Sequence, residues 1–123
     1  MSEVVDPRLI ARSLTDHWSP RIVGEIDDSF LKVAKVKGEF PWHSHEDEDE
    51  MFMVLEGELS IHMEDRTVEL TVGEVFVVPK GVRHHPVAKE ECLILLIERK
   101  STKHMGGVVM ERTRTIEQQW NQQ

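Results

Sequence analysis

The sequence predicts an all-β domain, a sandwich or barrel of antiparallel strands preceded by one short helix. Two observations lead to this prediction. From about Ser29 onward the chain consists of short runs of apolar and β-branched residues. Turn signals separate these runs at close, regular intervals, as at residues 56–58 (Glu-Gly-Glu) and 79–81 (Pro-Lys-Gly). Many short strands in series with Gly and Pro turns are typical of a sandwich or barrel.

The helix is expected near the N-terminus, where Asp6 suits the N-cap and Pro7 suits the first helical position. It is expected to end before Pro20, because a residue that precedes proline is pushed out of the helical region. In the tail, residues 108–110 could add an edge strand, and residues 118–123 are polar enough to fray. Strands are expected at residues 30–37, 51–55, 59–63, 67–71, 75–78, 83–88 and 92–98.

Length and composition fit one ordinary globular domain of 123 residues, 39% hydrophobic and 31% charged. We expect an N-terminal helix and lead-in over residues 1–20, a barrel over 21–100 and a C-terminal tail over 101–123. No apolar run approaches the roughly 20 residues that cross a bilayer, and the N-terminus does not read as a signal peptide. A cytoplasmic protein without a membrane partner is therefore expected. The net charge of −8 argues against nucleic acid as a partner.

Histidines gather at two places, in the sequence His-Ser-His at 43–45 and at His84-His85. Residues two apart in an extended strand point to the same face, so His43 and His45 present two imidazoles side by side. Adjacent residues point to opposite faces, so only one of His84 and His85 can join them. Glu50 follows across a tight acidic connection and can add a carboxylate. Three imidazoles and one carboxylate, with two sites left for water or substrate, suit Mn, Fe, Ni, Cu or Zn.

Two stretches resemble the two sequence motifs of the cupin superfamily. Residues 38–57, GEFPWHSHEDEDEMFMVLEG, resemble the first motif, and residues 73–84, GEVFVVPKGVRH, resemble the second. The resemblance implies a small single-domain, metal-binding cupin, with a double-stranded β-helix or jelly-roll barrel. It also implies that His43, His45, Glu50 and His84 bind one divalent metal ion. The spacing before His43 is one residue shorter than the family's, and alanine stands at position 88 where asparagine is usual; neither change removes a ligand.

Several neighbouring residues are expected to play lesser roles. The acidic residues 46–49 read as a solvated turn rather than a second metal site. His85 must face away from His84, which favours a supporting or surface role, while alternation cannot decide the place of His62. Trp42 should point away from the metal and be covered. Cys92, the single cysteine, lies in an apolar run and is expected to be buried and inert.

Phe52 and Val54 share a strand face with Glu50 and are expected to line a pocket near the metal. A metal ion with open coordination positions, next to the apolar wall of a pocket, suits a small organic ligand. The leading hypothesis is a metal-dependent enzyme, a dioxygenase or an isomerase or lyase, in which Glu50 could double as a base. The main alternative is a metal-dependent small-ligand sensor without turnover. A metal-free sugar epimerase is disfavoured, because it has no use for four ligands.

The sequence also favours a homodimer. Residues 51–55 and 92–97 are apolar on both faces, whereas a barrel strand with one wet face should alternate. The outer faces are therefore expected to be covered, most simply by a second copy, which is also the usual state of small cupins. The rival explanation is that the N-terminal helix and the C-terminal tail provide the cover.

Overall fold

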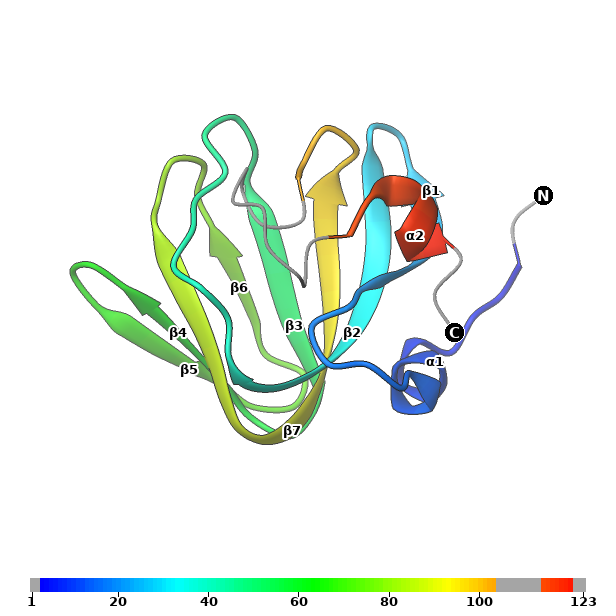
Figure 1. Ribbon diagram of the computed structural model, residues 1–123, viewed down its shortest axis with the longest axis horizontal. Helices are drawn as coiled ribbons and strands as arrows, with labels where there is room; N and C mark the ends of the chain where they lie inside the picture. The colour runs from blue at the N-terminus through cyan, green and yellow to red at the C-terminus, as the bar shows by residue number, and fades with distance from the viewer. Residues whose placement is uncertain (1–2, 104–113, 121–123) are drawn as a thin grey trace.

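A computed structural model describes residues 3–103 and 114–120 and confirms the all-β barrel (Figure 1). None of the helices in the described ranges is both long and apolar enough to cross a membrane. In chain order the elements are α1 (Pro7–Ser13), β1 (Arg21–Ile26), β2 (Ser29–Glu39), β3 (Glu50–Glu56), β4 (Leu59–Met63), β5 (Thr67–Leu70), β6 (Val75–Val78), β7 (His84–Arg99) and α2 (Ile116–Trp120).

The strands form an antiparallel sheet in the order β1-β2-β7-β3-β6, and β4 pairs with both β5 and β7. The long strand β7 connects the two sides of the barrel (Figure 1). Its first residues pair with β4, and its second half lies between β2 and β3. The sequence predicted two strands here, at residues 83–88 and 92–98. They form one strand because the exposed residues between them continue the extended backbone around the bend.

The predicted helix is shorter than expected, since α1 ends at Ser13 rather than before Pro20. Asp6 caps it as predicted, accepting a hydrogen bond from the backbone N–H of Leu9 at 3.1 Å. The chain leaves the helix because Leu14 adopts an extended conformation. Trp18 then donates its backbone N–H to the carbonyl of Lys35 on β2, at 2.9 Å. This pairing draws the segment onto the barrel.

Two elements were not foreseen. Strand β1 carries Gly24 and two charged residues, Arg21 and Glu25, so its pattern gave no clear strand signal. Helix α2 lies in the part of the tail that was expected to fray, and this expectation was wrong for residues 118–120. There Gln119 is buried and the Trp120 ring meets Phe30 edge-on at 5.7 Å. The predicted edge strand at residues 108–110 lies outside the described residues.

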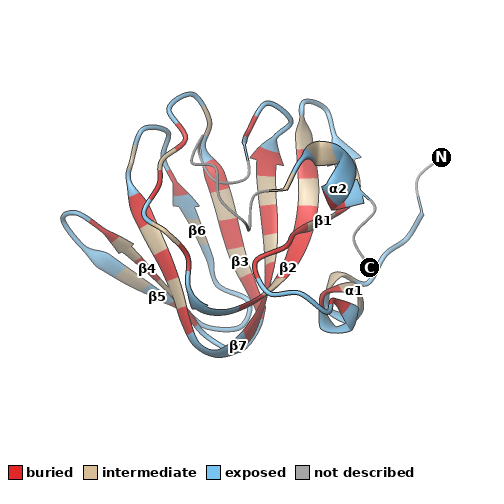
Figure 2. Cartoon of the chain, viewed as in Figure 1, coloured by how far each residue is buried: buried red, intermediate tan, exposed pale blue. Residues whose placement is uncertain are grey.

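Buried residues recur along β2, β3 and β7 (Figure 2), and they form two apolar clusters. The larger cluster fills the barrel interior, and a smaller one lies between α1 and the outer sheet face. Helix α1 therefore covers part of the outer face, as the rival explanation for the apolar strands proposed. Met53 and Leu95 pack against the smaller cluster, and beyond them the same face continues as half-buried or exposed apolar residues: Met51, Val75, Val77 and Ile97.

Candidate metal centre

Two of the predicted ligands are held together by the backbone. His84 opens β7, and His43 lies in the connection that follows β2. Each donates its backbone N–H to the carbonyl of the other, at 3.1 and 2.9 Å, and so forms an isolated β-bridge. The bridge places their ring centroids 4.3 Å apart. It is a contact between segments far apart in sequence, and it brings the two motifs into one site.

The other two predicted ligands complete the cluster. Glu50 is the first residue of β3, and the carbonyl of His45 accepts the backbone N–H of Gly81 at 2.8 Å. Oε1 of Glu50 lies 3.2 Å from Nε2 of His84 and 3.4 Å from Nε2 of His45. One ligand atom from each of the four residues lies within 4.8 Å of the others, and all four side chains are buried.

Backbone carbonyls orient two of the imidazoles. His43 donates from Nδ1 to the carbonyl of Pro41 at 2.8 Å, and His84 donates from Nδ1 to the carbonyl of Val82 at 3.0 Å. In a neutral ring, protonation at Nδ1 leaves the lone pair on Nε2. Metal-binding histidines commonly have such a partner on the nitrogen that does not bind the metal. These two rings are therefore held in the tautomer and orientation that metal binding needs.

The cluster contains a buried polar atom without a partner. Nε2 of His45 is fully buried, and its 3.4 Å approach to Glu50 does not satisfy hydrogen-bond geometry. Buried polar groups are costly to leave unsatisfied, and few remain so in native proteins. Ligands that bind one ion at about 2.1 Å lie roughly 3–4 Å from one another, and the 3.2 and 3.4 Å separations between Glu50 and two of the imidazoles match this range. The donor set, its spacing and the free nitrogen all fit a transition-metal ion.

Burial and mutual contact shift the pKa values of the residues in this cluster. Burial, aided by repulsion from His84, lowers the pKa of His43 from 6.5 to about 4, so this ring is neutral at pH 7. Burial alone would lower the pKa of His45 as well, but contact with Glu50 outweighs it and the pKa is raised. Burial likewise opposes ionisation of Glu50, yet its contacts with His45 and His84 hold its pKa well below the usual value. Glu50 is therefore a carboxylate, ready to bind a cation.

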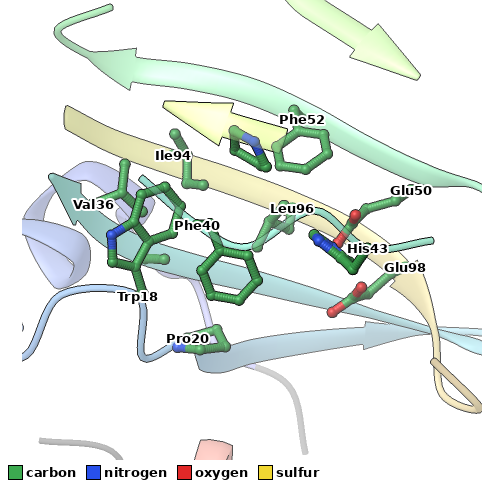
Figure 3. A pocket seen from close by; sticks show the side chains of 12 residues that line it. Trp18, Pro20, Val36, Phe40, His43, Glu50, Phe52, Ile94, Leu96 and Glu98 are labelled. Atoms are coloured by element: carbon green, nitrogen blue, oxygen red, sulfur yellow. The ribbon is translucent and has the colours of Figure 1, made fainter. Parts of the chain in front are cut away.

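A small cavity of about 40 Å³ adjoins the cluster (Figure 3). His43, Glu50 and Glu98 lie at its polar end. Its other walls are apolar and include Phe52, as the sequence predicted. Val54 shares that strand face but is fully buried in the core and is not among the lining residues. The remaining lining residues are Trp18, Pro20, Ala34, Val36, Phe40, Pro86, Ile94 and Leu96.

The residues that were assigned lesser roles lie outside the cluster. Residues 46–49 form a turn that is exposed except for the half-buried Glu48. His85 points away from the ligands, hydrogen-bonding the Phe40 carbonyl and Glu39. Trp42 is 37% exposed, so the expectation that it would be covered was wrong; it stacks on His85 with ring centroids 5.2 Å apart.

Two other predicted positions also lie apart from the metal cluster. Nδ1 of His62 forms a hydrogen bond with the hydroxyl of Thr67 at 2.9 Å. Cys92 is buried, and burial raises the pKa of its thiol to about 12.

Sequence reasoning missed three residues near the site. Trp18 forms part of the cavity wall, and its indole N–H donates to the Lys37 carbonyl at 2.8 Å. Glu98 contributes a second carboxyl at the polar end, and Lys32 forms a buried ion pair with it at 2.7 Å. Glu98 is opposite Glu50 in the register of β3 and β7. Strand alternation places Glu98 on the face of Ile94 and Leu96, but only the pairing register shows that this face meets Glu50.

Comparison with known proteins decides the family. Residues 30–98 match the sequence profile of the Cupin_2 family, described as a cupin domain. This chain belongs to the cupin family. Among curated proteins, the cupin is 32% identical to YdbB of Bacillus subtilis (strain 168) over 104 residues, covering 84% of this chain and 92% of YdbB.

Solved structures agree with this assignment. A cupin-2 domain protein from Shewanella frigidimarina NCIMB 400 is 46% identical, with a TM-score of 0.76 over 79% of this cupin and 95% of that chain. NMB1881 from Neisseria meningitidis is 26% identical, with a TM-score of 0.72 over 80% of this cupin and all of that chain (100%). Both matches extend over most of the barrel, so the motifs found in the sequence belong to a complete cupin domain.

Proposed function

We propose that this cupin binds one divalent metal ion, Mn, Fe, Ni, Cu or Zn, and acts on a small organic molecule in the adjoining cavity. The convergence of four buried ligand atoms on one point carries this proposal. His43, His45 and His84 would supply imidazole nitrogens, and Glu50 a carboxylate oxygen. Four protein ligands leave positions open for water or substrate when the bound ion is five- or six-coordinate.

The bound ion would act as a Lewis acid on an oxygen atom of the small molecule, or would supply the reactivity toward dioxygen that a dioxygenase needs. The chain's own residues account for the rest. The apolar walls exclude water and hold the carbon skeleton, while the polar end at His43 and Glu50 orients the oxygen. Glu50 would act as a base where its coordination loosens. This set of roles fits a dioxygenase or an isomerase or lyase.

The cavity size restricts the ligand. A cavity needs roughly 10–15 Å³ for one water-sized group, so about 40 Å³ admits a fragment of only a few heavy atoms. A larger molecule requires neighbouring side chains to move. The ligand is therefore a small molecule, or a larger one of which a small end enters the barrel.

Turnover and simple binding can be separated experimentally. Metal-loaded protein would be screened against a panel of small oxygen-containing molecules, with oxygen uptake, product formation and the shift in thermal unfolding temperature measured together. Product formation or oxygen uptake that His84→Ala abolishes supports an enzyme. A metal-dependent thermal shift without turnover supports a sensor instead. A thermal shift of equal size in His84→Ala would contradict the metal-dependent site for either function.

We also propose that two copies associate through the outer sheet face that α1 leaves uncovered. Val75 and Val77 are 53% and 49% exposed there, beside the half-buried Met51 and Met53. This patch carries no charge in a chain whose net charge is −8, so a like patch is its most compatible partner. A dimer would remove these side chains from water without bringing charged groups together.

A further inference from the structure

A buried ion pair lies inside the barrel next to the proposed metal site. Nζ of Lys32 is 2.7 Å from Oε1 of Glu98, and the two side chains are 1% and 4% exposed. Removing two charges from water is costly, and apolar residues of similar volume are often as stable or more so. The pair therefore needs an explanation other than stability. Its position relative to Glu50 provides one.

Glu98 and Glu50 are direct partners across the β3–β7 ladder, so both carboxyl groups point into the barrel. Both side chains are buried, and both line the same cavity. Figure 3 shows the two carboxyl groups next to each other at the polar end of the cavity, beside His43. Lys32, Glu98 and Glu50 thus form a continuous buried chain of contacts.

Lys32 and Glu50 each have a distinct hydrogen-bonding requirement. Lys32 can only donate hydrogen bonds and needs an acceptor. Glu50 turns Oε1 toward His45 and His84, and its carboxylate needs a donor to fix its plane. A carboxyl group between them meets both requirements at once. Two neighbouring buried carboxyl groups do not both ionise, so one proton is shared, and the Glu98 carboxyl can donate to Glu50 while it accepts from Lys32.

We propose that Glu98, held by Lys32, is a positioning residue that fixes the Glu50 carboxylate in the orientation a metal ion requires. The inference rests on the proposed metal site and goes one step beyond it. Hydrogen-bond partners of metal ligands typically change metal affinity by about 10–100-fold when they are removed. A pair that served stability alone would leave metal affinity unchanged.

Two variants separate these possibilities. In Glu98→Gln, the amide oxygen can still accept from Lys32 and the amide N–H can still donate to Glu50. In Lys32→Met/Glu98→Leu, both contacts are lost, but neither member of the ion pair is left buried without the other. The matched control is Lys100→Met/Glu25→Leu, which removes an ion pair with the same 2.7 Å separation at the protein surface.

The measurements are the Kd for Co²⁺ by chelator competition, the visible spectrum of the Co²⁺-loaded protein, and urea unfolding of the metal-free protein. We expect Lys32→Met/Glu98→Leu to bind Co²⁺ about 10–100-fold more weakly and with an altered spectrum, at an undiminished unfolding midpoint. Glu98→Gln should restore the affinity to within about threefold, and the surface control should match the wild type.

Wild-type affinity and spectrum in Lys32→Met/Glu98→Leu would overturn the inference while leaving the metal site intact. Equal weakening in Glu98→Gln and the double variant would also overturn it, because the amide retains both contacts. Failure of the wild type itself to bind Co²⁺ would reject the proposed function, and the inference with it.

Discussion

Acidification of the metal-free protein should remove stability through His43. Its pKa is lowered from 6.5 to about 4 by burial and by His84, so between these values the unfolded chain binds a proton that the folded protein does not. Stability therefore rises with pH across this window: the contribution of the neutral ring is complete above pH 6.5 and lost as pH falls toward 4. At roughly 1.4 kcal/mol for each unit of pKa, the loss is about 3 kcal/mol.

The assay is urea unfolding of chelator-treated protein at several pH values between 7 and 4.5, for the wild type and for His43→Gln. Other groups titrate in both proteins, so the difference between the two pH dependences isolates the buried ring. The wild type should lose up to about 3 kcal/mol more than the variant over this range. Parallel curves for the two proteins would refute the reasoning that His43 is buried in its neutral form.

Three further predictions concern the fold and its surfaces. Gly57→Ala should destabilise the protein by about 2–4 kcal/mol in urea unfolding, because φ is +90° and the new Cβ would lie 3.0 Å from the Glu91 carbonyl oxygen. Gly73→Ala, with φ +85° and open space, should cost only about 1–2 kcal/mol, and equal losses would contradict this account. Val77→Lys should convert the proposed dimer to a monomer in sedimentation velocity; an unchanged sedimentation coefficient would exclude this face. Cys92 should react with a thiol reagent only after unfolding, and rapid labelling of the native protein would contradict its burial.

The ligand cluster could be predicted because its members lie in two short motifs with local geometry. Alternation brings His43 and His45 to one face, and it sends His85 away from His84, as the structure shows. The family motifs then assigned Glu50 and His84 to the same point. The turn at Gly57 could also be predicted from the sequence, and Gly57 has a positive φ of +90° there.

The residues that surround the ligand cluster could not be predicted in the same way. Lys32 and Glu98 are separated by most of the barrel sequence, and their meeting depends on the registers of β2, β7 and β3. Charged residues in strands normally read as solvent-facing, so their pattern gave no sign of burial. Trp18 was missed because the short helix ends early and the chain then crosses to β2. Such long-range pairings carry no local signal in the sequence.

Metal content per chain, measured by elemental analysis of purified protein, tests the central claim most directly. The wild type and His43→Ala/His84→Ala would be compared before and after reconstitution with Mn, Fe, Ni, Cu and Zn salts. We predict about one transition-metal ion per wild-type chain, lost in the double variant, because four ligand atoms converge within 4.8 Å. No bound metal in either protein after reconstitution, or equal metal in both, would contradict the metal site.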